Sequence, residues 1–110
     1  MAKTSLVSAL TFALPALVAV LAVPLLLEWV PPNRFYGFRT PETLGSPQLW
    51  YEVNRATGWA LLIAALLGLV GACAVAFLGA EWPPARRQVV AFCWEGICIL
   101  LALFVVAVRM

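Results

Sequence analysis

The sequence contains no histidine and no aspartate, and only 11% of its 110 residues are charged. Without these residue types, His-dependent triads, Cys–His nucleophiles, paired aspartates and the usual zinc or iron ligand sets are excluded. The charged fraction is less than half of the roughly 25% that soluble domains carry. Because the catalytic and metal-binding residue types are missing, we expect neither an enzyme nor a bound metal or other cofactor. The net charge of +2, with scattered arginines, also gives no indication of nucleic-acid binding.

Cysteine is scarce as well. The three cysteines, Cys73, Cys93 and Cys98, all lie in apolar runs and form no C-x-x-C pair. Such cysteines are typical of small side chains that face lipid or the protein core, with a disulfide or a thiol function as the alternative.

Apolar residues make up 65% of the chain and give it a mean hydropathy of +1.00. A chain of this length cannot bury so much apolar surface in a water-soluble fold. Two uncharged runs, 4–27 and 56–80, would each reach about 36 Å as helices, enough to cross a hydrocarbon core of about 30 Å. We predict an all-α membrane protein with one domain and three transmembrane helices, at about 4–29, 47–80 and 86–109, with an ordered polar loop at 30–46.

The first span has an alternative interpretation as a secretory signal peptide, because Lys3 supplies a basic start. Its apolar part exceeds the usual ~7–15 residues, and no clear A-x-A site precedes Pro24. We expect a retained helix. Three crossings then place the two termini on opposite sides of the membrane.

Small residues recur at every fourth position of the second span, from Ala56 to Ala80. Small residues let helices approach closely in lipid. Because such a row drifts around the helix by about 40° per step, only part of it can face one partner. We expect helix packing at Ala64, Gly68 and Ala72, although alanine is also simply common in this chain.

Polar chemistry gathers in the segment 31–58, PPNRFYGFRTPETLGSPQLWYEVNRATG, which holds both tyrosines. Thr40 is suited to cap a short helical turn, which Gly45 would end in a left-handed conformation. Ser46 is suited to cap the second long helix. We expect ordered turns that lie on the membrane surface.

Two further features, in this segment and directly after it, predict how the segment is held. The aromatic side chains Trp50, Tyr51 and Trp59 are suited to the headgroup level of the bilayer. Glu52 and Arg55 are three positions apart on a helix and close enough to form an ion pair.

The same segment resembles the signature of the SdpI family of small bacterial membrane proteins. The matching positions are Asn33, Gly37, Arg39, Thr40, Pro41, Thr43, Leu44, Ser46, Trp50, Asn54, Arg55 and Gly58. The resemblance implies a multi-pass protein of the bacterial cytoplasmic (inner) membrane. The founding member of the family protects cells against a secreted peptide toxin and holds a transcriptional repressor at the membrane. This sequence departs from that member in lacking its additional N-terminal helices.

We expect the polar loop to be a recognition face, in a non-enzymatic binding, immunity or regulatory module. Its ligand would be a peptide, a lipid headgroup or a partner membrane protein, because guanidinium groups suit carboxylates and phosphates. Alternatively, each arginine anchors the loop at the headgroups or pairs internally with Glu42 or Glu52. The candidate binding residues are Asn33, Arg34, Tyr36, Gly37, Arg39, Thr40, Trp50, Asn54 and Arg55.

Glu95 interrupts the third span. An ionisable residue inside the membrane is costly and usually faces the bundle interior or a cavity. Counted from Gln88, Glu95 would lie about 10 Å below the surface opposite the loop, at the depth of Thr11 and Gly71. A structural interpretation makes it protonated and hydrogen-bonded to Ser8 or Thr11.

A functional interpretation makes Glu95 the coupling group of a small proton- or cation-coupled transporter or channel. Three helices enclose little space, so such a protein would have to be a homo-oligomer. An accessory subunit of a larger membrane complex is the third alternative.

Overall fold

The computed structural model describes residues 2–33 and 35–109, and only the backbone of residues 2–8. It contains the helices α1 (Ala2–Leu26), α2 (Pro41–Leu44), α3 (Pro47–Leu78) and α4 (Pro84–Arg109), and no strand in the described ranges. Three of these helices, α1, α3 and α4, are long and apolar enough to cross a membrane. The prediction of an all-α protein with three transmembrane helices is confirmed.

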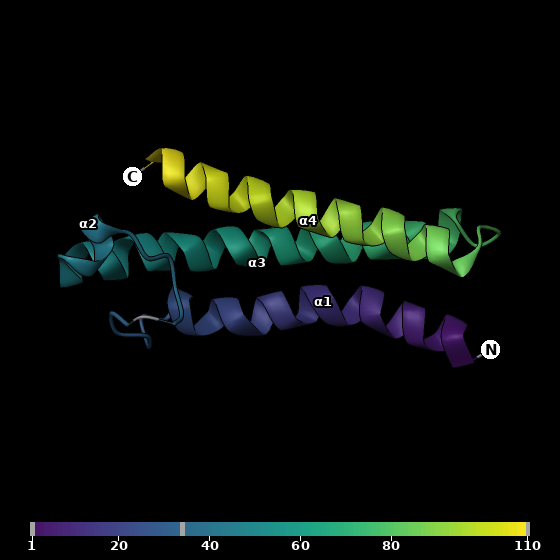
Figure 1. Ribbon diagram of the computed structural model, residues 1–110, viewed down its shortest axis with the longest axis horizontal. Coiled ribbons are helices and arrows are strands. Elements are labelled where there is room, and N and C mark those ends of the chain that lie inside the picture. The colour runs from purple at the N-terminus through teal and green to yellow at the C-terminus, as the bar shows by residue number, and fades with distance from the viewer. Residues whose placement is uncertain (1, 34, 110) are drawn as a thin grey trace.

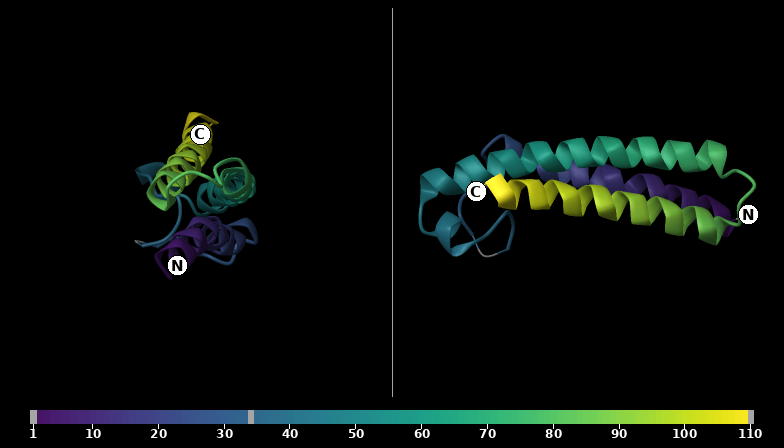
Figure 2. Two further views of the ribbon diagram at one scale, coloured as in Figure 1. Left: turned by 90° about the vertical axis from the view of Figure 1, so that its right-hand side faces the viewer. Right: turned by 90° about the horizontal axis from the view of Figure 1, so that it is seen from above.

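The helix α3 lies between α1 and α4 and packs against both (Figure 1). The bundle is elongated, with extents of 51 × 25 × 19 Å. The polar loop lies at the same end as the C-terminus, whereas the N-terminus lies at the other end with the α3–α4 turn (Figures 1 and 2). The long axis exceeds a hydrocarbon core of about 30 Å, so the loop is placed at the headgroup level of one leaflet when the bundle crosses the membrane.

The end of α1 turns the chain back toward α3. The helix ends at Leu26, short of the expected end at residue 29. The N–H of Glu28 donates to the carbonyl of Leu25 at 3.2 Å, and the N–H of Trp29 donates to the carbonyl of Pro24 at 2.9 Å. Glu28 is left-handed, with φ 62°. This is a Schellman ending in which glutamate takes the position that glycine usually occupies.

Side-chain caps begin the two helices that follow, as predicted. The N–H of Thr43 donates to Thr40 Oγ1 at 3.1 Å, and the N–H of Thr40 donates to Thr43 Oγ1 at 2.8 Å. The N–H of Leu49 donates to Ser46 Oγ at 3.3 Å. The predicted left-handed Gly45 is wrong: its φ is −84° and its ψ is −9°, which is right-handed helical backbone.

The closest approach of α1 and α3 is at Gly58. A Cβ atom there would lie 2.6 Å from the backbone nitrogen of Leu26 and 2.9 Å from the carbonyl oxygen of Ala22. Both are backbone atoms, so no side chain can move aside to make room. Glycine at this position is therefore a requirement of the α1–α3 contact.

The centre of the small-residue row on α3 is buried, namely Ala64, Gly68 and Ala72, whereas Ala56, Ala76 and Ala80 are exposed. At Gly68 all three long helices meet. A Cβ atom there would lie 3.4 Å from Pro15 Cγ of α1 and 3.4 Å from Glu95 Cγ of α4.

The α3–α4 contact is fixed by Trp94. Its indole nitrogen donates to the carbonyl of Leu67 at 2.8 Å, and its ring lies over Gly71, where a Cβ atom would be 2.0 Å from Cδ1. An indole N–H in an apolar environment usually finds such a partner.

The outer surface of the bundle carries large apolar side chains and two of the cysteines, Cys73 and Cys93. All three cysteines are free thiols, and Cys98 is buried.

Candidate functional site: the polar loop and its pocket

The loop begins with a turn organised by Asn33. Its Oδ1 accepts hydrogen bonds from the N–H groups of Phe35 at 2.8 Å and Tyr36 at 2.7 Å. Its Nδ2 donates to the carbonyls of Pro31 at 2.8 Å and Tyr36 at 3.0 Å. Asparagine commonly makes such local bonds to its own loop. The Asn33 carboxamide therefore shapes the loop and has little capacity left for a ligand.

Asn54 of α3 holds the middle of the loop from below. Its Oδ1 accepts from the N–H of Phe38 at 2.5 Å, and its Nδ2 donates to the carbonyls of Phe38 at 3.3 Å and Trp50 at 2.9 Å. The carbonyl of Phe38 also accepts from Thr43 Oγ1 at 3.2 Å. Asn54 is 2% exposed. Its role in the structure is that of a buried anchor.

Trp50 was expected to seat the segment at the headgroup level, and the structure shows that it does so neither as a lipid-facing nor as an exposed side chain. The side chain is fully buried, and its indole nitrogen donates to the carbonyl of Val30 at 2.8 Å. Gly37 lies against it with φ 117°, a conformation that favours glycine. A Cβ atom on Gly37 would lie 2.8 Å from Asn54 Oδ1 and 3.0 Å from the Trp50 ring.

Arg55 pairs with Glu28, not with Glu52 as predicted. Its Nη1 lies 3.6 Å from Glu28 Oε1, and the two side chains are 54% and 45% exposed. The left-handed turn after α1 brings Glu28 beside α3, which no local spacing indicates. An exposed pair of this kind contributes about 0–1 kcal/mol. Arg34, another candidate, lies outside the described residues.

Arg39 differs from these neighbours. Its exposed guanidinium makes no hydrogen bond or ion pair with any residue that the structure describes, including Glu42 and Glu52. Next to it, the Thr40 hydroxyl is used in the cap of α2. Of the candidate side chains whose contacts are described, Arg39 is the one left available for a ligand.

Tyr36 faces the opposite side of the loop, toward α1. Its hydroxyl donates a hydrogen bond to the carbonyl of Leu21. Burial raises the pKa of Tyr36 above the ordinary value of 10.0, because the anionic phenolate loses hydration there. Tyr36 is therefore a neutral hydrogen-bond donor at physiological pH.

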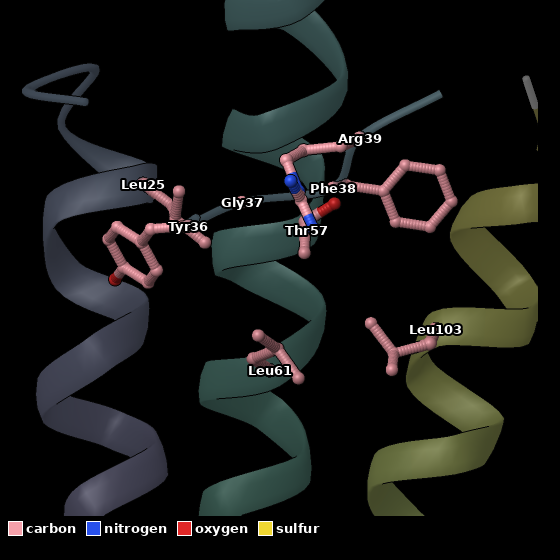
Figure 3. A pocket seen from close by; sticks show the side chains of 8 residues that line it. All are labelled: Leu25, Tyr36, Gly37, Phe38, Arg39, Thr57, Leu61 and Leu103. Carbon is pink, nitrogen blue, oxygen red and sulfur yellow. The ribbon is translucent and has the colours of Figure 1, made fainter. Parts of the chain in front are cut away.

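A pocket of about 330 Å³ opens beneath the loop. Arg39 and Thr57 lie at its loop end, and the apolar side chains of Leu61 and Leu103 lie farther from the loop (Figure 3). Its walls come from the loop and from all three long helices: Leu25, Tyr36, Gly37, Phe38, Arg39, Thr57, Leu61 and Leu103. The pocket is thus amphipathic, with a guanidinium that has no partner among the described residues next to a leucine-lined floor.

Sequence reasoning found three of these wall residues, Tyr36, Gly37 and Arg39, and missed the rest. The missed leucines lie within apolar spans, where nothing distinguishes them from leucines that face lipid. A second open groove of about 380 Å³, between α3 and α4, has an entirely apolar lining that includes Ile63, Trp94 and Leu101. Unlike this groove, the pocket beneath the loop combines apolar walls with a charged group.

The buried anchors of the loop fall on the positions of the signature noted in the sequence. The model of the SdpI/YfhL protein family matches residues 30–110, which is most of the chain. The chain belongs to this family. The match takes in the loop, α2, α3 and α4, whereas α1 precedes it. Comparison with curated proteins and with solved structures gives no match.

In this SdpI-like membrane protein most signature residues stabilise the fold of the loop, as Asn54, Trp50 and Thr43 show. Gly58 allows α1 to pack closely against α3. The three apolar helices make it a multi-pass membrane protein.

Proposed function

We propose that this protein is a non-enzymatic binding module of the membrane, which takes an amphipathic anion into the pocket beneath its polar loop. The anionic group would bind the Arg39 guanidinium, and the apolar part would lie along Leu61 and Leu103. The observation that carries the proposal is the exposed guanidinium, without a described partner, at the rim of an apolar pocket.

The chemistry of the rim supports this ligand class. A guanidinium binds carboxylate or phosphate through two parallel hydrogen bonds, and such charge-assisted bonds are stronger than neutral ones. The volume of about 330 Å³ lies in the range of small-molecule sites.

The rigidity of the loop supports the proposal independently. Phe38, which precedes Arg39, is fixed by the buried carboxamide of Asn54, and Thr43 also donates to its carbonyl. A preorganised site loses less conformational entropy when its ligand binds. The bonds within the loop are therefore compatible with a recognition role, in which Asn54 and Thr43 position Arg39.

Two sources carry this ligand chemistry: the phosphate of an anionic lipid, and the terminal carboxylate of a membrane-inserted peptide. The peptide would fit an immunity role and the lipid a regulatory one. We propose to test both in nanodiscs. The lipid arm compares bound phosphatidylglycerol with bound phosphatidylcholine by native mass spectrometry. The peptide arm compares an apolar peptide with a free C-terminus against its amidated form.

The variants are Arg39→Gln, Arg39→Lys and, as a control, Arg86→Gln. Arg86 lies in the first turn of α4, at the opposite end of the bundle. Its Cζ lies 4.7 Å from the centre of the Trp82 ring. Loss of a charge-assisted hydrogen bond is worth about 1.5–3 kcal/mol, so Arg39→Gln should weaken binding of the anionic probe roughly tenfold or more. Binding of the anionic probe to Arg39→Lys should be intermediate between the unmodified protein and Arg39→Gln. Lysine keeps the positive charge but cannot form the two parallel hydrogen bonds of a guanidinium. Equal binding of charged and neutral probes, or equal loss in Arg86→Gln, would contradict the proposal.

A further inference from the structure

Glu95 lies near the middle of the bundle, deeper than its sequence position suggested. The helix α4 begins at Pro84, so Glu95 is about 16 Å along its axis. Its neighbours are Pro15 of α1 and Gly68 of α3, about one turn farther in than the expected Thr11 and Gly71. The error arose because α4 starts before residue 88, from which the depth was counted.

The carboxyl group of Glu95 is buried and lacks a hydrogen-bond partner among the described residues. The residue is 2% exposed, and neither Oε1 nor Oε2 has a partner. The expected hydrogen bond to Thr11 is therefore not formed, and the side chain of Ser8 lies outside the described residues. Burying a polar group without a hydrogen-bond partner costs free energy, and such groups are rare in folded proteins.

A small cavity of about 10 Å³ lies beside the carboxyl group. That volume is at the lower limit for holding one water molecule. Apart from Glu95 itself, its lining consists of apolar side chains and one glycine: Leu14, Pro15, Val18, Ala64, Ala65, Gly68 and Ile99.

No described cation faces the carboxyl group from any helix packed against it. Residues 9–26 of α1 and residues 56–72 of α3 contain no ionisable side chain. On α4 the nearest ionisable groups are Cys93 and Cys98, which gain negative charge when they ionise. An unpaired ionised carboxylate in such surroundings costs several kcal/mol, whereas the neutral acid avoids this cost.

We propose that Glu95 is an intramembrane proton-binding site, at which the carboxylic acid holds its proton together with one water molecule in the cavity beside Gly68. In the exchange step the O–H bond of the acid breaks as its proton passes to the water, while one O–H bond of the water breaks and that proton binds the other carboxyl oxygen, so that both molecules stay neutral. A hard cation needs about six oxygen ligands, and the described lining side chains offer only those of Glu95.

This site is independent of the pocket beneath the loop and of any ligand bound there. Proton-coupled transport would require such a site, whereas the exchange of one proton in the bundle interior requires no transport.

Infrared difference spectroscopy of the protein in lipid tests the proton. The carbonyl stretch of a protonated carboxyl should be present at neutral pH, should shift on transfer to deuterium oxide, and should disappear in Glu95→Gln. Glu81→Gln is the control, since Glu81 is exposed at the end of the bundle. Absence of the band, or a band that never responds to deuterium oxide, would overturn the proposal.

The variant Gly68→Ala tests the water. The added methyl group would make ordinary contacts at 3.4 Å with Pro15 and Glu95 while filling the cavity. The carbonyl stretch should then move to higher frequency, and exchange with deuterium oxide should slow several-fold. Gly96→Ala, with nothing within 4 Å of its added carbon, is the matched control. An unchanged band and exchange rate in Gly68→Ala would exclude the water.

A labelling experiment on the unmodified protein covers the case in which a variant fails to fold. Dicyclohexylcarbodiimide partitions into lipid and reacts with protonated carboxyl groups. Mass spectrometry should find the adduct on Glu95 in preference to the four other glutamates, and less of it as the pH rises. Preferential labelling of another glutamate would contradict the assignment.

Discussion

Asn54 bonds to both backbone groups of Phe38: its Oδ1 accepts from the N–H at 2.5 Å, and its Nδ2 donates to the carbonyl at 3.3 Å. A single carboxamide thus holds a loop residue to α3 across 16 positions of sequence. Because Arg39 follows Phe38 directly, the charged rim of the pocket depends on a side chain that does not line the pocket itself.

Asn54→Ala should loosen the loop and destabilise the protein. The N–H of Phe38 would lose its partner, and leaving such a group unsatisfied costs about 1–3 kcal/mol. We expect a lower thermal unfolding midpoint in detergent and faster amide exchange at Phe38. Gln48→Ala is the control, because Gln48 is exposed in the first turn of the same helix. An equal midpoint for the two variants would show that Asn54 is not an anchor.

Gly58→Ala should separate α1 from α3. The added carbon would lie 2.6 Å from a backbone atom of Leu26, and overpacking of this kind typically costs about 1–3 kcal/mol. Gly96→Ala offers the matched comparison, since its added carbon meets nothing within 4 Å and alanine favours a helix by up to about 1 kcal/mol. Thermal unfolding of both variants in detergent measures the difference. Equal stability of the two would refute the close α1–α3 contact.

The sequence was sufficient for features that depend on neighbouring residues. Span lengths follow from the run of apolar side chains, and the caps at Thr40 and Ser46 follow from local hydrogen-bond chemistry. The resemblance carried by the loop also pointed to the correct family, because its polar positions are numerous and differ in chemical type.

Features that depend on distant segments could not be predicted. Trp50 was expected to be an exposed interfacial side chain because nothing local shows that Val30 returns to accept its N–H. The partner of Arg55 is set by a left-handed glutamate at the end of another helix, which sequence rules assign to glycine. The floor of the pocket needs leucines from separate helices, and only their packing brings Leu61 and Leu103 together.

Arg55→Gln should change stability little, in contrast to Asn54→Ala. The Arg55–Glu28 pair is about half exposed at a distance of 3.6 Å, and such pairs are worth about 0–1 kcal/mol and are screened by salt. We expect a shift in unfolding midpoint that is small at low salt and absent at high salt. A large, salt-independent loss would mean that Arg55 makes a further contact, and would return it to the candidate binding residues.

Alkaline titration of Tyr36 tests the burial of the loop against α1. The chain has two tyrosines, so Tyr51→Phe leaves Tyr36 as the one that ultraviolet absorbance reports. Its pKa is raised above 10.0 in the folded state, so the folded protein retains this proton at a pH where the unfolded chain has lost it. The contribution to stability is therefore complete below pH 10, and falls as the pH rises through the folded pKa. A phenolate that forms at or below pH 10.0 would show that the Tyr36 hydroxyl is in water and not against Leu21.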